Sequence, residues 1–344
     1  MAARATRRRT APAVRPAARP RRKRATANVP GPPRRARPAT AAVRRAPAKR
    51  PAADPLRAMR EAFEAHFAKT LRANGAPRGR LGEAILYSAL GPGKRLRPLL
   101  VLATAEAVGG EWREALPAAA AVECVHAFSL VHDDLPAMDD DDMRRGRPTT
   151  HRRFGEALGV LAGDALLAFA FEEITRLPAA RHDPRRVLAC VRMLADAAGA
   201  NQLIEGQALD IEAEGRRADR EVVEAIHVRK TGALIAASMA LGALAGGAPI
   251  PQVHALYDAG LDLGLAFQIH DDLLNARSSL ARLGKRAGTD AARGKATWPS
   301  AVGIERAVQD AGALYAAVME RLRPFGPRAA RLVALVSSVA ERER

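Results

Sequence analysis

Aromatic and cysteine residues are both scarce in this sequence of 344 residues. Phe, Trp and Tyr together make up 4% of the chain, so a core has to be built mainly from aliphatic side chains. The two cysteines, Cys124 and Cys190, lie in apolar stretches with helical spacing. Two thiols exclude a disulfide framework, and their apolar surroundings predict reduced core residues, as in a cytoplasmic protein.

Long uncharged apolar runs and a secretory signal are absent as well. No run reaches the roughly 18 to 20 residues that a membrane-spanning helix needs. The N-terminal residues lack the apolar centre of a signal peptide. We therefore predict that the protein has no transmembrane segment and works in the cytoplasm.

The first fifty residues lack acidic side chains altogether. They contain 17 Lys or Arg and no Asp or Glu, in a background of Ala and Pro. Such a segment buries too little apolar surface to offset its ordering entropy, so we predict a disordered basic tail at residues 1–54. Without these 17 cations the chain has 38 basic residues (55 − 17) against 37 acidic ones, so the net charge of +18 belongs to the tail.

Three interpretations of this tail stay open. It could contact polyanions without sequence preference, it could direct import into an organelle, or translation could start at Met59. The tail has no aromatic ring on which a base could stack. The support for a nucleic-acid-binding role of the whole protein is therefore weak, and we assign the function to residues 55–344.

Residues 55–344 show helical periodicity almost throughout. Ala, Leu, Glu and Arg dominate, apolar residues recur at spacings of three and four, and strand-like runs are rare. The segment from Asn275 to Ala296 has no clear period and is predicted to form a basic flap. We predict one large all-α domain, with helices at 55–73, 81–90, 97–108, 114–135, 154–177, 184–214, 219–229, 231–246, 250–274, 298–322 and 327–342.

A dense acidic cluster follows the apolar run that ends at Val131. Six aspartates lie within ten residues, from Asp133 to Asp142. Like charges at the end of a buried helix repel one another, so a cation should neutralise them, and Mg²⁺ prefers carboxylate oxygens and bridges them to phosphates. Asp133 and Asp139 lie about 240° apart on a regular helix and can reach one ion only if the helix breaks, which Pro136 favours.

A second acidic pair, Asp271-Asp272, also ends an apolar stretch. Asp271 and Asn275 are four residues apart and share a helix face. An isolated run of Asp could be a solvated loop. Two such pairs at the ends of buried helices instead look like two halves of one metal site.

Basic motifs accompany the acidic ones. The sequence Gly93-Lys94-Arg95-Leu96-Arg97-Pro98 places three cations at a glycine-flanked helix start, where backbone N–H groups already favour an anion. Arg144 and Arg145 directly follow the acidic cluster, and their guanidinium groups suit phosphate oxygens. These motifs predict phosphate pockets, although each alone could be a solvated basic turn.

Taken together, the motifs are similar to those of a known family. The chain from about residue 55 to 344 resembles the trans-isoprenyl diphosphate synthases, and among them the bacterial farnesyl diphosphate synthases. The matching segments are GKRLRP, HDDLPAMDDDDMRRGRPTTH, GQALD, KTG, FQIHDD and the two Gly-Lys pairs that end in Lys285 and Lys295. The resemblance implies an all-α helical bundle of the isoprenoid synthase type with a central active-site cavity, usually a homodimer.

The resemblance also implies a reaction and a set of site residues. An allylic diphosphate ionises with the help of three Mg²⁺ ions, and the double bond of isopentenyl diphosphate attacks the resulting cation. The metal ligands would be Asp133, Asp139 and Asp271. Isopentenyl diphosphate would bind to Lys94, Arg97, His126 and Arg145. The allylic diphosphate would bind to Arg144, Lys230, Lys285 and Lys295, with Thr231 and Gln268 facing the developing cation.

Product length is predicted from the residues just before the first aspartate. Phe128 and Ser129 precede Asp133 by five and four positions, and an aromatic ring there would close the bottom of the elongation tunnel. In the family this pattern, with the Pro-Ala insertion after Leu135, is typical of synthases that make a C15 product. Phe128 could instead be an ordinary core residue.

Departures from the family pattern keep several alternatives open. Asn275 stands where the second motif usually has Asp, which predicts a weaker link to Mg²⁺. Geranylgeranyl or geranyl diphosphate synthesis is the nearest alternative, and a low-activity or regulatory homologue is another. A terpene cyclase would share the first motif, but it has no need of the second phosphate pocket around Lys94 and Arg97.

Overall fold

The computed structural model describes residues 54–216, 218–282 and 295–341, without the side chains of residues 180 and 277–282. The predicted tail, apart from Asp54, and Lys285 therefore lie outside the described residues. The unit presented below spans Ala52–Arg344.

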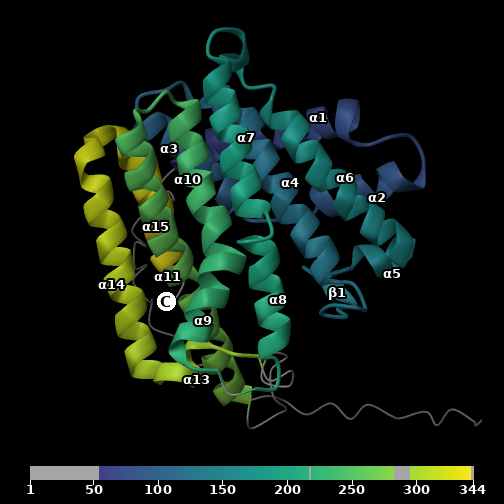
Figure 1. Cartoon of the computed structure of the whole chain (residues 1–344), viewed down its shortest axis with the longest axis vertical. Coiled ribbons are helices and arrows are strands. Elements are labelled where there is room, and N and C mark those ends of the chain that lie inside the picture. The colour runs from purple at the N-terminus through teal and green to yellow at the C-terminus, as the bar shows by residue number, and fades with distance from the viewer. Residues whose placement is uncertain (1–53, 217, 283–294, 342–344) are drawn as a thin grey trace, which may run out of the picture. The chain divides into compact units, whose positions relative to one another are not determined.

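Helices form nearly all of the described chain, as predicted (Figure 1). Short 3₁₀ helices at Trp112–Ala115, Pro178–Arg181 and Arg323–Ala329 and π-helical turns at Leu71–Gly75 and Val228–Gly232 connect or extend them. The α-helices are α1 Arg57–Thr70, α2 Arg80–Ala89, α3 Leu96–Ala107, α4 Leu116–Asp133, α5 Thr150–Phe154, α6 Glu156–Ile174, α7 Pro184–Ala198, α8 Leu203–Ala213, α9 Arg220–His227, α10 Ala233–Ala245, α11 Ile250–Arg282, α13 Trp298–Val302, α14 Ile304–Leu322 and α15 Ala330–Ala340.

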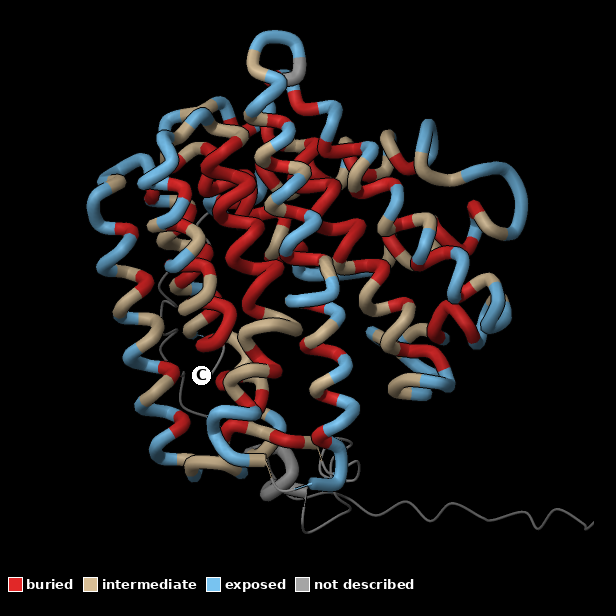
Figure 2. Tube along the Cα trace, viewed as in Figure 1, coloured by how far each residue is buried: buried red, intermediate tan, exposed pale blue. Residues whose placement is uncertain are grey.

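The core lies around α10 and α4. Every residue from Ala233 to Leu244 in α10 is buried, and the helix packs against α3, α4, α7 and α11. Figure 2 shows the buried residues concentrated on these central helices. Small alanine side chains let the helix axes approach closely, which is how a chain with few aromatic rings still fills its interior.

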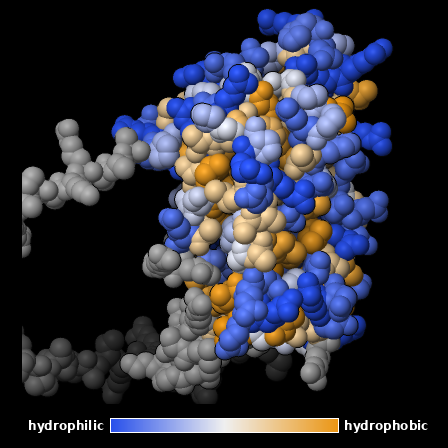
Figure 3. Space-filling view, turned by 90° about the vertical axis from the view of Figure 1, so that its left-hand side faces the viewer, coloured by the Kyte–Doolittle hydropathy of each residue, from blue (hydrophilic) through white to orange (hydrophobic). Residues whose placement is uncertain are grey.

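The outer helices are amphipathic, as α14 illustrates. Its buried residues Ala307, Ala311, Val318 and Leu322 recur at helical spacing and face the core. Figure 3 shows the face of the molecule on the side of α14, where hydrophobic side chains lie between strongly hydrophilic ones. This helix therefore closes one side of the domain.

Several predicted helix boundaries were wrong. The helix expected at 184–214 is divided into α7 and α8 after Gly199, and the helix expected at 298–322 is divided at Gly303, where φ is +89°. The segment from Asn275 was predicted to lack regular structure, but α11 continues to Arg282. No Gly or Pro interrupts residues 275–282, so nothing ends the helix there.

A small hairpin was not predicted. β1 Met143–Arg144 pairs antiparallel with β2 Arg147–Pro148, and Arg144 lies opposite Arg147. Arg145 and Gly146 form the turn with positive φ angles of 52° and 76°. This is the backbone geometry of a two-residue hairpin loop, and it holds Arg145 at the tip.

Three helical stretches are long and apolar enough to span a membrane by length and composition, which the sequence analysis did not predict. In Trp112–Asp133 and Arg220–Ala245 the apolar window is 72% buried inside the protein, so these stretches serve the core. In Pro184–Ala213, which contains α7 and α8, the window is only 33% buried. This stretch presents apolar side chains on the surface of the domain.

Candidate active site

The first acidic cluster folds back on itself at the end of α4. The helix ends at Asp133, three residues before Pro136, which has no N–H group to continue it. The N–H of Asp139 donates to the carbonyl of Asp133 at 2.8 Å, and the N–H of Asp140 donates to that of Leu135 at 3.1 Å. The predicted helix break is present, and it returns Asp139 to the level of Asp133.

Asp133 lies among charges from several elements. Its pKa is raised to about 6, chiefly by burial and further by the charge of Asp139, while Lys230, Arg144 and Lys295 act in the opposite direction. Burial disfavours the carboxylate because it removes water from the charge. A divalent cation bound here would relieve the same cost.

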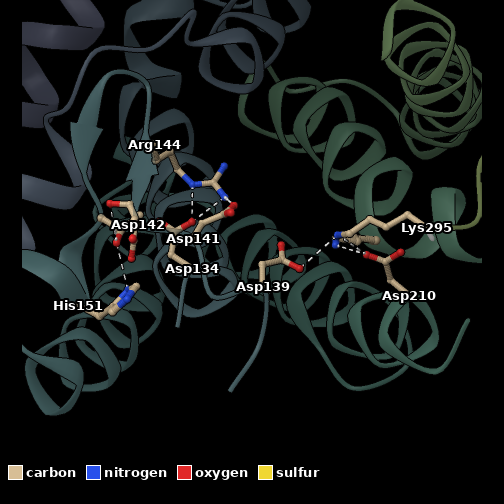
Figure 4. A network of polar contacts seen from close by, with 10 residues as sticks. Asp134, Asp139, Asp141, Asp142, Arg144, His151, Asp210 and Lys295 are labelled. Atoms are coloured by element: carbon tan, nitrogen blue, oxygen red, sulfur yellow. Dashed lines mark hydrogen bonds and ion pairs between the residues drawn. The ribbon is translucent and has the colours of Figure 1, made fainter. Parts of the chain in front are cut away.

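Asp139 belongs to a chain of alternating charges (Figure 4). The ammonium nitrogen of Lys295 lies 3.2 Å from Oδ1 of Asp139 and 3.4 Å from Oδ2 of Asp210. Lys230 lies 2.7 Å from the same oxygen of Asp210. We call the surrounding hollow the lysine–aspartate cavity; it is lined by Asp210, Ile226, His227, Lys230, Thr231, Gln268, Asp272, Asn275, Lys295, Ala296 and Thr297.

Lys230 and Thr231 lie in the π-helical turn Val228–Gly232 between α9 and α10. A wider turn of this kind redirects side chains and is frequent at functional sites. The hydroxyl of Thr231 donates to Oε1 of Gln268 at 3.1 Å. The predicted pair thus comes together from two helices.

Glycines make this approach possible. A Cβ on Gly264 would lie 2.5 Å from the Cα of Gly232, so α11 can cross the π-helical turn only without a side chain there. Gln268 is one helical turn beyond Gly264, which brings its amide level with Thr231. A Cβ on Gly206 would likewise lie 2.2 Å from the backbone nitrogen of Lys230, which explains the glycine of the GQALD segment.

A second hollow lies beside Asp134, the residue after Asp133. We call it the arginine cavity; it is lined by Tyr87, Ser88, Ala89, Gly91, Pro92, Arg95, Glu123, His126, Ala127, Leu130, Val131, Asp134, Arg144, Arg145, Arg147, Pro148, Thr149 and Thr150. Arg95 is buried and bound to Glu123 at 2.6 Å and to Glu64 at 2.8 Å. Its role is to hold α1, α3 and α4 together, since both carboxylates are on neighbouring helices.

Arg97 and His126 lie beside this arginine cluster. The Nε atom of Arg97 is buried and has no hydrogen-bond partner. Burial, the largest cause, and the charge of Arg145 lower the pKa of Arg97 to about 10, although Glu123 and Asp271 raise it. Burial and four arginines, Arg97 first among them, lower the pKa of His126 well below its usual value. An anion at this position would satisfy both groups.

Three predicted diphosphate ligands have other neighbours in the structure. Lys94 is exposed and lines a separate hollow with Arg60 and Leu335, near α15. Arg144 is paired with Asp134 at 2.6 Å and lines the arginine cavity, although it was predicted for the allylic diphosphate. Arg145 donates to the carbonyl of Pro92 at 2.8 Å.

Phe128 and Ser129 lie on α4 before the acidic cluster. Phe128 is 6% exposed, and its ring packs edge-on against His132 at 5.4 Å between centroids. His132 in turn lies 3.0 Å from the carbonyl of Val160 on α6. The hydroxyl of Ser129 donates to the carbonyl of His126. Phe128 is thus buried beside His132 of its own helix, and a tunnel-closing role stays a prediction.

Comparisons with known proteins agree with these features. The polyprenyl synthetase family model matches residues 79–340. A chloroplastic geranylgeranyl pyrophosphate synthase, number 11 of Arabidopsis thaliana, is 46% identical over 262 residues, which is 75% of this chain and 73% of that protein. The farnesyl diphosphate synthase of Geobacillus stearothermophilus is 41% identical over 264 residues, covering 77% and 89%. The chain belongs to the polyprenyl synthetase family.

A solved polyprenyl synthetase supports the fold as well. The apo crystal structure of an FPP/GFPP synthase from Zymomonas mobilis has a TM-score of 0.73 and 36% identity, over 83% of this chain and 98% of that one. These relatives confirm that the all-α domain is an isoprenoid synthase fold. Their names differ in the product, so they leave chain length open.

The donor set of this polyprenyl synthetase fits magnesium. The charge of Asp139 helps to raise the pKa of the nearby Asp133, and the ammonium of Lys295 already lies against Asp139. Within residues 54–216, 218–282 and 295–341, no group of three or more His, Cys, Asp or Glu side chains converges on one point. Mg²⁺ keeps several waters and shares ligands with substrate phosphates, so it does not need such a cage.

Sequence reasoning missed two residues of the site, His227 and Trp298. His227 Nε2 lies 2.8 Å from Oδ2 of Asp272, and the backbone N–H of Trp298 donates to the same oxygen at 2.8 Å. His227 lies next to the KTG segment, and Trp298 lies three residues after Lys295. Their proximity to known motifs was the available signal.

Proposed function

We propose that this protein condenses isopentenyl diphosphate head-to-tail with dimethylallyl or geranyl diphosphate to give farnesyl diphosphate. The observation that carries the proposal is the pair of separately lined cavities, one with Asp134 and Arg144 and the other with Lys295, which contacts Asp139. One presents guanidinium groups with few carboxylates, and the other alternates Asp and Lys. Each suits one diphosphate, and a reaction that needs two diphosphates at once is a condensation rather than a cyclisation.

The arginine cavity would hold isopentenyl diphosphate. Arg97 and Arg145 are supported as ligands by the buried unsatisfied Nε of Arg97 and the position of Arg145 at a hairpin tip. His126 would act as a neutral hydrogen-bond partner, because its lowered pKa keeps the ring uncharged at neutral pH. Lys94 would have to turn from its own hollow toward this diphosphate.

The lysine–aspartate cavity would hold the allylic diphosphate. Lys230 and Lys295 would bind its oxygens, together with Arg144 from the hairpin and Lys285. Asp133, Asp139 and Asp271 would hold Mg²⁺, three ions per site, which would supply Lewis-acid neutralisation of the leaving group. Asn275 lines the same cavity and would offer a neutral carbonyl where the family has a carboxylate.

The chemistry follows from charge neutralisation. The allylic C–O bond breaks and its electron pair leaves with the diphosphate. Thr231 and Gln268 would turn their oxygen dipoles toward the carbocation. The isopentenyl double bond forms the new C–C bond, and the departing diphosphate takes the proton that is lost. Enclosure between helices keeps water from the cation.

Incubation with labelled isopentenyl diphosphate, Mg²⁺ and a C5, C10 or C15 allylic diphosphate tests this proposal. We expect C15 as the main product from the C5 and C10 partners, measured by chromatography of the dephosphorylated alcohols. Deleting residues 1–54 should leave turnover unchanged, which also tests whether the tail contributes by contacting polyanions. Absence of turnover with every partner would contradict the proposal and favour a regulatory homologue.

Product length is the finer part of the proposal. Phe128→Ala should open space below the cavity and shift the product to C20 or longer. Phe325→Ala is the matched control, because Phe325 packs on the same core from the 3₁₀ helix Arg323–Ala329, away from α4. A C20 product from the unaltered protein would favour the alternative, geranylgeranyl diphosphate synthesis, which the Arabidopsis relative's name also suggests.

We also propose a homodimer in the cytoplasm. Apolar side chains are exposed on α6, α7 and α8: Val160 41%, Leu161 49%, Leu188 68%, Ile204 48% and Ile211 41%. A second copy covering them would remove this surface from water. Light scattering after size exclusion checks the mass, and Ile204→Glu with Ile211→Glu should yield a monomer. The chloroplastic relatives keep organelle import by the tail as the alternative location.

A further inference from the structure

The second aspartate of the Asp271-Asp272 pair is placed differently from the first. Asp271 is half-buried and interacts electrostatically with Arg97, whereas Asp272 is only 6% exposed. Oδ2 of Asp272 lies 2.8 Å from Nε2 of His227 and 2.8 Å from the backbone nitrogen of Trp298. Both carboxylate oxygens are engaged, since Oδ1 lies 3.5 Å from Nε2 of Gln268.

These contacts give the hydrogen bonds a direction. An ionised carboxylate only accepts, so Gln268 must turn its NH₂ group toward Asp272. Its carbonyl oxygen then faces Thr231 and accepts from the hydroxyl at 3.1 Å. The oxygen lone pairs of Thr231 are left for the cavity. The amide of Gln268 has no such preference without Asp272, because its two ends have the same shape.

Asp272 also fixes the segment that carries Lys295. The N–H of Trp298 belongs to the first residue of α13, and a capping box formed by Thr297 and Ser300 closes the start of this helix. Lys295, three residues earlier, contacts Asp139 and Asp210. The ring of His227 stacks on that of Trp298 at 6.2 Å between centroids. One buried carboxylate thus connects α9, α11 and α13.

We propose that Asp272 and His227 form a positioning pair, which fixes the amide of Gln268 and thereby the hydroxyl of Thr231, and that Asp272 is not a metal ligand. The inference rests on the proposed condensation, since it assigns Thr231 and Gln268 to the developing cation. To bind a metal ion, Asp272 would have to give up donors from three elements in a buried place, where each unpaired donor is costly.

Asp272→Asn is the first test. The asparagine carbonyl can still accept the hydrogen bonds from His227 and Trp298, so its NH₂ group faces Gln268. The glutamine amide must then turn over. Thr231 then meets an NH₂ group instead of a carbonyl. We expect kcat to fall ten- to hundredfold, while the KM for isopentenyl diphosphate and the half-saturating Mg²⁺ concentration change less than twofold. A rise in that Mg²⁺ concentration of tenfold or more would overturn the proposal, since it would identify Asp272 as a ligand.

His227 gives a second, independent variant. His227→Gln keeps an N–H donor for Asp272 and should retain kcat within about threefold, whereas His227→Leu should lower it tenfold. Asp310→Asn is the matched control, because Asp310 accepts from the indole N–H of the same Trp298 at 3.1 Å without contact to Gln268. Equal losses in His227→Gln and His227→Leu would overturn the positioning role.

A charge exchange separates this inference from the proposed function. In Asp272→Asn with Gln268→Glu, the new carboxylate accepts from both Asn and Thr231, so each contact is complementary again. Urea unfolding of the two single variants and the double variant should show a favourable coupling, whether or not the protein is active. An inactive unaltered protein would count against the condensation alone. Additive effects on stability would count against the hydrogen-bond direction.

Discussion

The arginine cavity and the lysine–aspartate cavity both contain basic side chains, but they differ in how far carboxylates neutralise them. In the lysine–aspartate cavity, Lys230 and Lys295 are both paired with Asp210, and Lys295 also with Asp139. Beside the arginine cavity, Arg97 has a buried nitrogen without a hydrogen-bond partner and a neighbouring like charge in Arg145. One side is neutralised from within, while the other has an excess of positive charge.

This difference indicates two ways of binding the same chemical group. The pKa of Asp210 is lowered, although burial, the largest influence, opposes this, because the Lys230 and Lys295 charges favour the carboxylate more strongly. A diphosphate entering there has to compete with these carboxylates unless Mg²⁺ takes them over. The arginine cavity needs no metal, since four arginines, Arg95, Arg144, Arg145 and Arg147, line it against only two carboxylates, Glu123 and Asp134. We therefore expect one metal-dependent and one metal-independent diphosphate site.

The largest effect should come from Asp139→Asn, which removes a carboxylate that contacts Lys295 of the lysine–aspartate cavity. It removes the charge that Lys295 contacts and a predicted Mg²⁺ ligand, so we expect kcat to fall at least about 10²-fold. Steady-state turnover at saturating Mg²⁺ measures it. Asp142→Asn in the same acidic run is the control, because that side chain is exposed and forms its ion pair with the exposed Arg152. Equal losses in both variants would contradict the assignment.

Arg145→Met and Lys295→Met should separate the two substrates. A hydrogen bond to a charged group contributes about 1.5–3 kcal/mol, so each loss should raise one KM roughly ten- to hundredfold. Arg145→Met should raise the KM for isopentenyl diphosphate, and Lys295→Met that for the allylic partner. Measuring both KM values for both variants checks this. If either variant raised both values equally, the two cavities would not be separate sites.

Removal of metal tests directly whether the two cavities differ in their need for Mg²⁺ to bind a diphosphate. With EDTA, inorganic diphosphate should still raise Tm by a few degrees, because binding to the folded state alone stabilises it. Arg97→Met should abolish this shift, and Lys230→Met should leave it. Differential scanning fluorimetry at fixed protein concentration measures both. A shift that appears only with Mg²⁺ would contradict metal-independent binding in the arginine cavity.

The sequence allowed part of this site to be predicted for local reasons. Pro136 made a helix break after Asp133 predictable, and the break does return Asp139 to Asp133. The pairing of Asp272 with His227 and Trp298 spans 45 and 26 positions, so only the packing of α9, α11 and α13 determines it. The motif alone presents Asp271 and Asp272 as equivalent carboxylates.

Other features depended on tertiary packing in the same way. Regular spacing predicted the helices around residue 230 but not the π-helical turn, because a single extra residue in a turn leaves no periodic trace. The hairpin at Arg144 and Arg147 has Gly146 as its only turn residue with a clear preference for positive φ, and Arg145 adopts the same region without such a preference. The direction of the Lys94 side chain could not be predicted from GKRLRP, which contains three cations within four residues.

The smallest effect concerns the pH dependence of folding stability that His126 in the arginine cavity contributes. Burial and four arginines lower the pKa of His126 in the folded state, so the unfolded chain binds its proton first as pH falls. This histidine therefore supports the folded state above pH ~6.5 and costs at most about 1.4 kcal/mol per pH unit below it. Urea unfolding at about pH 7.5, 6.5 and 5.5, that is above, at and below that point, should show a smaller loss of stability with falling pH for His126→Gln than for the unaltered protein. Parallel losses would mean that neither burial nor the arginines lower the pKa of His126 in the folded protein.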